Sequence, residues 1–284
     1  MSQEPAVVLS SLRDQTARAF LVDSLSATHT IAPLPRVCAQ LAELTAQQVT
    51  DAAQLAKLIQ SDPALAGEIM RVANSPALRP RAGIVSLQQA VSWLGVAEVR
   101  NIGMAVMLRG EVFNAPGHEP ESEELWREAA VAGLWAKEIA RERRKHVESA
   151  FLAALMHRTG AALALKILSH FEANQRTAMD ARTFADLVME FEAKFGRLLM
   201  SAWRLPADVQ DGATEWRNYR ESSHSDLAGT VHAANLLATY TLYPQLTSDD
   251  VVLENPVFEQ LGVFPDDRKA MLAKRDHVRS LAGV

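Results

Sequence analysis

The sequence predicts an all-α protein. Runs of alternating β-branched and aromatic residues between Gly or Asn turns are nearly absent, so strand signals are weak. Apolar residues instead recur at spacings of three and four, as in Leu65, Ile69 and Val72. Alanine and leucine dominate these stretches, and several of them begin at recognisable capping residues.

The apolar periodicity and the turn residues together place thirteen helices. In chain order we expect them over residues 6–24, 35–45, 52–60, 63–73, 87–94, 97–112, 123–143, 147–157, 160–170, 183–202, 206–216, 225–240 and 266–281.

Helix starts are clearest in the first half of the chain. Asp62 followed by Pro63 predicts an N-cap with proline at the first helical position, where the missing N–H costs nothing. Ser86 with Gln89, and Asp51 with Gln54, have the spacing of a capping box. Asn74 before Ser75-Pro76 is typical of a helix end, although contact with a ligand or partner is the alternative.

Two changes of composition divide the chain. The stretch 113–122, with two prolines and a glycine, predicts a linker, and a second break follows Tyr243-Pro244. We therefore expect an N-terminal helical extension (1–30), an N-terminal helical subdomain (31–115), a helical core (116–244) and a C-terminal helical cap (245–284).

Charge and cysteine content exclude several classes of protein. With 29 basic and 34 acidic side chains the net charge is -5, so no nucleic-acid partner is expected. Cys38 lies in an apolar pattern and is interpreted as a buried small side chain, which leaves no disulfide framework and no cysteine zinc site. The N-terminus lacks a secretory pattern, and we expect no window that approaches the about 18 apolar residues of a membrane span. A cytoplasmic protein without a membrane partner is the expectation.

A series of short motifs covers the first half of the chain in a fixed order. Leu34-Pro35 opens a helix, and it is followed by Ser61-Asp62-Pro63-Ala64-Leu65, by Arg71-Val72-Ala73-Asn74-Ser75 and by Leu94-Gly95. In this order and spacing, from Ile31 to about Thr239, the chain resembles the HDOD (HD-related output domain) family. The resemblance implies an HD-like helical bundle preceded by an N-terminal helical subdomain.

The second half resembles the core that HDOD proteins share with HD phosphohydrolases, in which His and Asp side chains bind metal ions that activate water. At the positions of those ligands this sequence departs from the pattern. The resemblance places the following residues there: Glu128, His157, Arg158, Glu192, Trp216, Arg217 and Asn235. Of these only His157 keeps its type, and the His-Asp pair becomes His157-Arg158.

An arginine in place of a metal-binding aspartate repels the cation as well as removing a ligand. Glu128, Glu192 and His157 remain chemically able to act as a replacement three-ligand set. We instead expect charge compensation, with Arg158 or Arg217 within about 4 Å of Glu128 or Glu192. Trp216 is expected to fill the former pocket, and a base-stacking role is the alternative. The other four tryptophans lie in predicted helices among apolar neighbours and are expected in the core: Trp93, Trp126, Trp135 and Trp203.

The family resemblance implies a non-catalytic output or scaffold module in bacterial signal transduction, without cofactor, that binds signalling proteins not identified by the sequence. The first alternative is a nucleotide or cyclic-dinucleotide sensor, in which Arg158 and Arg217 bind phosphate in the old pocket. The second alternative is a metal-dependent phosphohydrolase with rearranged ligands. The oligomeric state stays open.

Overall fold

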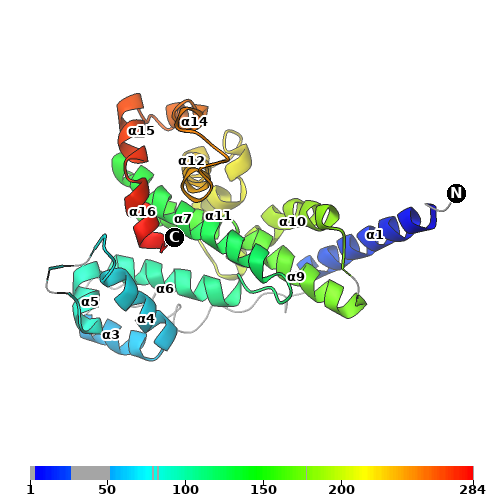
Figure 1. Ribbon diagram of the computed structural model, residues 1–284, viewed down its shortest axis with the longest axis horizontal. Coiled ribbons are helices and arrows are strands. Elements are labelled where there is room, and N and C mark those ends of the chain that lie inside the picture. Colours follow the sequence, from blue (N-terminus) through cyan, green and yellow to red (C-terminus); the bar gives the residue numbers. More distant parts are fainter. Residues whose placement is uncertain (1–3, 27–51, 79, 82, 177, 284) are drawn as a thin grey trace.

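The computed structural model describes residues 4–26, 52–78, 80, 81, 83–176 and 178–283. Every regular element within these ranges is a helix, which confirms the all-α prediction (Figure 1). The predictions for Cys38, for the helix start at Leu34-Pro35, for the helix over 35–45 and for the Asp51 cap lie outside the described residues.

The helices follow one another along the chain in four groups. The first is α1 (Glu4–Ser26) alone. The second comprises α3 (Ala52–Gln60), α4 (Pro63–Ala73), α5 (Leu87–Leu94) and α6 (Val96–Glu111). The third comprises α7 (Glu119–Glu142), α8 (Val147–Met156), α9 (Thr159–Gln175), α10 (Ala181–Ala202), α11 (Ala207–Thr214), the 3-10 helix η1 (Trp216–Asn218) and α12 (Ser225–Leu242). The fourth comprises α13 (Asp249–Leu253), α14 (Pro256–Gln260), α15 (Pro265–Leu272) and α16 (Arg275–Ala282).

Two predicted helix starts are confirmed by their caps. The Asp62 carboxylate accepts from the backbone N–H groups of Ala64 and Leu65, and α4 then begins at Pro63. The Ser86 hydroxyl accepts from the Gln89 N–H, while the Gln89 side chain accepts from the Val85 N–H. The second bond reaches one residue further back than an ordinary capping box.

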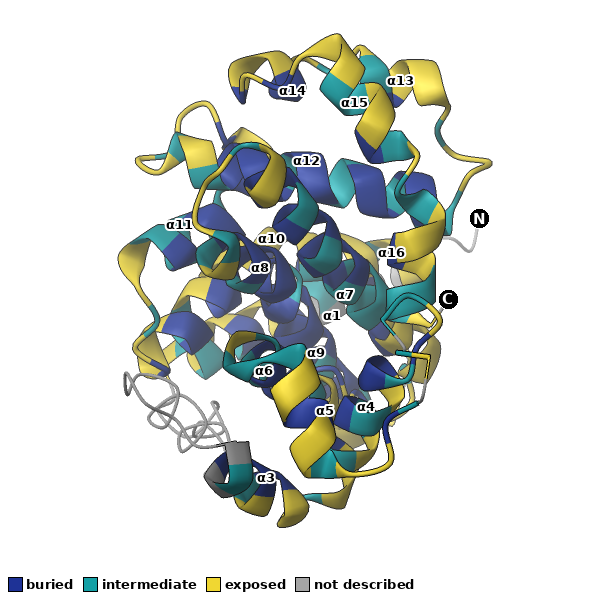
Figure 2. Ribbon diagram, turned by 90° about the vertical axis from the view of Figure 1, so that its left-hand side faces the viewer, coloured by how far each residue is buried: buried dark blue, intermediate teal, exposed yellow. Residues whose placement is uncertain are grey.

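The third group of helices supplies most of the buried apolar residues, while the second group has a cluster of its own. α7 packs against α8 and α12, and α9 packs against α10. Trp135 of α7 is fully buried, and its indole N–H donates to the Thr241 hydroxyl of α12 at 2.8 Å. Figure 2 shows α8 as a buried helix surrounded by others, while the cap helices α13 to α15 lie on the outside. α1 packs on α9 and α10 through Ala17 and Leu21.

The second group joins the core through α6, which packs against α8. The join also carries a buried ion pair, in which Lys137 of α7 lies 2.5 Å from the Glu98 carboxylate of α6. The cap reaches the same group, because the Arg71 guanidinium of α4 donates to the Leu281 carbonyl of α16 at 3.4 Å. Polar contacts thus join the second group to α7 and the fourth group to the second.

Several predicted boundaries were wrong. α7 begins at Glu119, inside the stretch predicted as a linker, because Pro120 occupies the first turn, where proline is tolerated. The helix predicted over 266–281 is two helices that meet at Ala273 and Lys274. The helix predicted over 206–216 ends at Thr214 and continues as η1. The four-part division by domain stays a prediction.

One stretch of the described chain is long and apolar enough to cross a membrane. It runs through α8 and α9 from Val147 to Gln175, and 83% of its most apolar window is buried inside the bundle. A second candidate combines α5 and α6, which are bent by 111° against each other. The expectation that no window is this apolar was therefore wrong, and the burial explains the composition as that of core helices.

Candidate functional site

The structure brings the seven predicted positions together from five parts of the bundle. They lie on α7 (Glu128), at the junction of α8 and α9 (His157 and Arg158), on α10 (Glu192), on η1 (Trp216 and Arg217) and on α12 (Asn235). We call these seven residues the vestigial site. They are joined by direct contacts, which are described below.

A glycine allows the two central helices of the site to approach closely. A Cβ at Gly160, in the first turn of α9, would lie 1.8 Å from the Glu192 carbonyl oxygen and 2.6 Å from the Gly196 nitrogen of α10. No other residue type fits this crossing without separating the helices. The crossing sets Arg158, two residues before Gly160, beside the Glu192 side chain.

Four charged side chains form one network at this crossing. Arg158 Nη1 donates to Glu192 Oε1 at 2.7 Å, and Arg217 donates to the other oxygen of the same carboxylate. Arg158 Nε lies 2.9 Å from Glu128 Oε2, although this contact lacks hydrogen-bond alignment. The predicted compensation between the arginines and the glutamates is thereby confirmed.

The network is graded from the interior to the surface. The Glu192 side chain is only 6% exposed, the Arg158 side chain 16%, and the Arg217 side chain 43%. A carboxylate this deeply buried requires compensation, and two guanidinium groups supply it. Burial raises the pKa of Glu128, and the like charges of Glu124 and Glu192 add to this, whereas Arg158 acts in the opposite direction.

His157 is the one ligand type that the resemblance retains, and both of its ring nitrogens have partners. Nδ1 lies 2.5 Å from the Ala154 carbonyl oxygen, which can only accept, so Nδ1 carries the proton in the neutral ring. Nε2 lies 3.0 Å from the Asn235 side-chain amide, whose NH₂ group can donate to it after a half-turn. Burial, helped by Arg158, lowers the pKa of His157 to about 3. The imidazole is therefore neutral and satisfied.

Trp216 fills the space between the histidine and the outer arginine. It is 7% exposed, and its ring meets the His157 ring edge-on at 5.2 Å between centroids. The Arg217 guanidinium covers the indole at 4.1 Å, and the Trp216 carbonyl oxygen lies 3.1 Å from His232 Nδ1. This packing agrees with the interpretation of Trp216 as a plug.

The described residues contain no group of three or more His, Cys, Asp or Glu side chains placed to hold a metal ion. The rival ligand set of Glu128, Glu192 and His157 is split by Arg158, which contacts both carboxylates. A divalent cation would have to displace a guanidinium before it reached those oxygens. The donor set does not fit a metal.

Sequence reasoning misplaced one aromatic residue. Trp93 was expected in the core with Trp126, Trp135 and Trp203, but it is 54% exposed on α5. The signal was present in the pattern, because Ala90 and Val91 form the buried face of α5 while Ser92 and Trp93 follow on the exposed side. Assigning the residues of this helix to its two faces would have predicted that Trp93 is exposed.

Fold and site together define an all-α protein with an HD-like core, in which a charge network occupies the expected ligand positions. The family model of the HDOD domain matches residues 31–219. The chain belongs to the HDOD family, as the sequence motifs predicted.

Solved structures share the whole fold. The chain is similar to a protein from Shewanella amazonensis provisionally named a metal-dependent phosphohydrolase, with a TM-score of 0.73 and 20% identity, covering 95% of this chain and 99% of that one. An HDOD domain protein of unknown function from Geobacter sulfurreducens matches with a TM-score of 0.69 and 16% identity, and the match covers 94% of this chain and 98% of that one. A protein from Marinobacter aquaeolei provisionally named a signal transduction protein matches with a TM-score of 0.64 and 20% identity, and the match covers 95% of this chain and 66% of that one. No curated protein matches the chain.

Proposed function

We propose that this chain is a non-catalytic signal-transduction module that acts by binding a partner protein and holds no metal. The observation that carries the proposal is the Glu192 carboxylate, which is buried and shared by Arg158 and Arg217. The positions at which an HD phosphohydrolase binds its metal ions are here satisfied by one another. A site in this condition has no open coordination position to offer to water or substrate.

The energetic argument rests on charge. Arginine stays protonated at any physiological pH, so Arg158 cannot be converted into a ligand by losing a proton. Its removal from Glu192 would leave the buried carboxylate with Arg217 as its remaining cation, and that side chain is 43% exposed, so the loss of compensation would cost about 2 kcal/mol. Metal binding would have to exceed that cost and the repulsion by the remaining Arg217.

The signalling role is supported by family membership and by the name of the Marinobacter aquaeolei protein. The three similar proteins described above all come from bacteria, and we extend a bacterial, cytoplasmic setting to this chain. A module without chemistry of its own transmits a signal through contacts, so its output is a complex with another protein.

The direct test is metal content and hydrolysis on the purified full chain. After incubation with Mn²⁺ or Fe²⁺ and desalting, we expect well below one metal ion per chain and no hydrolysis of nucleotides or cyclic dinucleotides. Stoichiometric metal together with hydrolysis that His157→Ala abolishes would overturn the proposal.

Arg158→Asp provides the matched positive case. This change restores a His-Asp pair and places a third carboxylate beside Glu128 and Glu192, so the variant should bind Mn²⁺ where the wild type does not. Calorimetric titration of both proteins with Mn²⁺ measures the difference, and Arg81→Asp, in an exposed loop outside the vestigial site, is the control. Equal Mn²⁺ binding by the wild type would contradict the proposed repulsion.

A second candidate function is recognition of a phosphate-bearing ligand at the outer edge of the site. Arg217 keeps 43% of its side chain exposed, and the neighbouring Arg220 is exposed beside the Tyr219 ring. Arg158 is less suited to this role because two carboxylates contact it. Calorimetry with a cyclic dinucleotide should show heat that Arg217→Gln abolishes, and no heat with the wild type rejects this candidate.

A further inference from the structure

A hollow of about 590 Å³ lies on the second group of helices and shares no residue with the vestigial site. Its lining comes from the loop after α4 and from α5, and we call it the Trp93 hollow. The lining residues are Pro80, Gly83, Ile84, Ser86, Gln88, Gln89, Ser92 and Trp93. None of them is ionisable.

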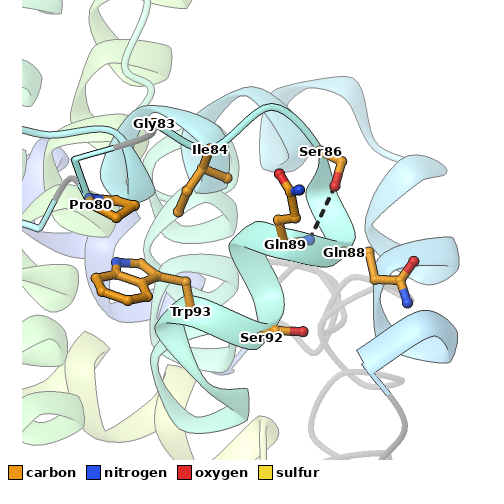
Figure 3. Close-up of a pocket in the computed structure, with 8 residues that line it drawn as sticks. All are labelled: Pro80, Gly83, Ile84, Ser86, Gln88, Gln89, Ser92 and Trp93. Carbon is orange, nitrogen blue, oxygen red and sulfur yellow. Dashed lines mark hydrogen bonds between the residues drawn. The ribbon is translucent and has the colours of Figure 1, made fainter.

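The hollow has two unlike sides. Figure 3 shows the Trp93 indole beside the Pro80 ring and Ile84, and the Gln89 amide with the Ser86 hydroxyl on the other side. Trp93 is 54% exposed, and Val85 at the same loop is 82% exposed, which makes them two of the large apolar side chains that the described fold leaves in solvent. An exposed indole next to an aliphatic side chain is typical of an interaction hot spot.

The walls of the hollow are held in place by internal hydrogen bonds. The Asn74 amide donates to the Ile84 carbonyl and accepts from the Ile84 N–H, both at 2.9 Å. The Trp93 indole N–H donates to the Leu78 carbonyl at 2.8 Å. The loop is thus fixed at both edges, so a ligand does not have to order it on binding. Asn74 is the C-cap residue of α4, which confirms the predicted helix end, and its backbone (φ -100°) is not in the left-handed region.

The indole N–H of Trp93 already donates within the protein, so it is not available to bind a ligand. A tryptophan that recognises polyproline segments uses this N–H toward the ligand, and here it is already bonded to Leu78. Trp93 can therefore contact a ligand only through its apolar ring. The Ser86 hydroxyl oxygen and the Gln89 amide oxygen already accept hydrogen bonds, so the donors left beside the ring are the Ser86 hydroxyl proton and the Gln89 NH₂ group. These groups suit an apolar anchor side chain with a polar backbone next to it.

The charge around the hollow opposes that of the whole chain. From Ile69 to Ala97 the sequence holds three arginines and no acidic residue, while the chain as a whole has a net charge of -5. Arg71 is paired with Glu68, so Arg81, in the loop itself, is the described cation closest in sequence to the lining. A partner segment with acidic side chains complements this local charge.

The openness of the hollow favours a protein over a small molecule. Ser86, Gln88, Gln89, Ser92 and Trp93 are all exposed, and only Ile84 is buried as a floor. Small ligands are usually enclosed over most of their surface, which this shape does not allow. A nucleic-acid strand would meet only a few cations on a chain of net negative charge.

We infer that the Trp93 hollow is a docking site for an acidic segment of a partner protein, which inserts one aromatic or branched aliphatic side chain beside Trp93. The inference rests on the proposed function in naming where the partner binds. It assigns the contact to the helical group before the HD-like core and leaves the vestigial site without a direct role.

The test is selection of peptides on the full chain. A display library of random 12-residue peptides is panned on the wild-type protein and depleted on Trp93→Ala protein, and enriched peptides are titrated by fluorescence anisotropy. We expect enriched peptides to be acidic with one aromatic or branched aliphatic residue, and Trp93→Ala to weaken their binding at least tenfold. Val85→Asp, which keeps the indole bond to Leu78 and adds a repelling charge, should weaken it to a similar extent.

Control and opposing outcomes are defined by charge and position. Phe264→Ala removes an aromatic residue of the cap that is even more exposed than Trp93 and should change binding less than twofold. Arg81→Glu should weaken the acidic peptides and favour their lysine-substituted forms. No enrichment, enrichment of basic peptides, binding that both variants retain, tighter binding of a single-stranded oligonucleotide, or self-association through Trp93 would each overturn the inference. Since metal content and hydrolysis are measured separately, the docking site and the non-catalytic assignment can fail independently.

Discussion

At the vestigial site charged side chains lie inside the helical core and meet partners of opposite charge, whereas the Trp93 hollow leaves a tryptophan and a valine in solvent on a fixed loop. Both regions are held by side-chain hydrogen bonds, but the bonds are of different kinds. Glu192 is held by two guanidinium groups, and the hollow is held by Asn74 and by the Trp93 N–H. The difference shows that a buried polar site is closed to ligands when its charged groups pair with one another. An apolar surface on a loop held by hydrogen bonds remains free to contact a partner.

Gly160→Ala should have the largest effect on the vestigial site. The added Cβ would overlap the Glu192 carbonyl oxygen, so α9 and α10 must separate and the ion network must open. We expect a loss of about 4 kcal/mol in the free energy of unfolding, or failure to fold, measured by urea denaturation. Gly110→Ala, where a Cβ meets nothing within 4 Å, is the control and should be neutral or slightly stabilising. A mild effect of Gly160→Ala would mean that the crossing is not tight.

Glu192→Gln removes the carboxylate that both arginines share. Because Arg158 is largely buried, the variant should lose about 3 kcal/mol in the free energy of unfolding. Glu190→Gln on the same helix breaks only the exposed pair with Arg18 and should cost less than about 1 kcal/mol. Similar losses in the two variants would show that the network contributes no more than a surface pair.

The pH dependence of stability tests the burial of His157. Its pKa is lowered to about 3 in the folded chain, so the unfolded chain binds more protons between pH 3 and 6.5, and stability falls as the pH falls through this window. Glu128, with a raised pKa, contributes with the opposite sign as the pH rises. His157→Gln should lack the His157 part, about 2 kcal/mol between pH 6.5 and 5. Parallel pH profiles of wild type and variant would contradict a buried neutral imidazole.

Asn74→Ala should have the smallest effect on stability and acts on the other region. It removes the two bonds to Ile84, and we expect a loss of about 1.5 kcal/mol in the free energy of unfolding. Selected peptides should also bind more weakly, because the loop would have to be ordered on binding. Gln88→Ala is the control, because it removes an exposed side chain that lines the hollow but leaves the bonds between Asn74 and Ile84 intact. Unchanged stability in Asn74→Ala would show that the loop is held by other contacts.

Local signals in the sequence predicted most of the fold. The caps at Asp62 and Ser86 and the spacing of apolar residues located the helices from α3 to α12 to within a few residues. The cap segment after Tyr243 was harder, because α13 and α14 are five residues each and too short for a periodic pattern. Pro120 was misinterpreted because proline both ends and begins helices.

The residues of the vestigial site could be chosen from the sequence only through the family resemblance, which supplied the register. From there the chemistry of the side chains was sufficient to predict that arginines and glutamates would pair. Which oxygen each arginine takes, and that Glu192 rather than Glu128 is shared, could not be predicted, since the network joins residues 25 to 34 positions apart on separate helices.

The sequence by itself determined the helical class, most helix starts and the replacement of a metal-binding acid by Arg158, because these depend on residue type and on neighbours within one or two turns. Only the tertiary structure decided that Glu192 joins both arginines, that His157 is satisfied on both nitrogens and that the Trp93 indole N–H donates to the Leu78 carbonyl. Such features depend on helix crossings like that at Gly160, where contact is set by backbone distance between segments far apart in the chain.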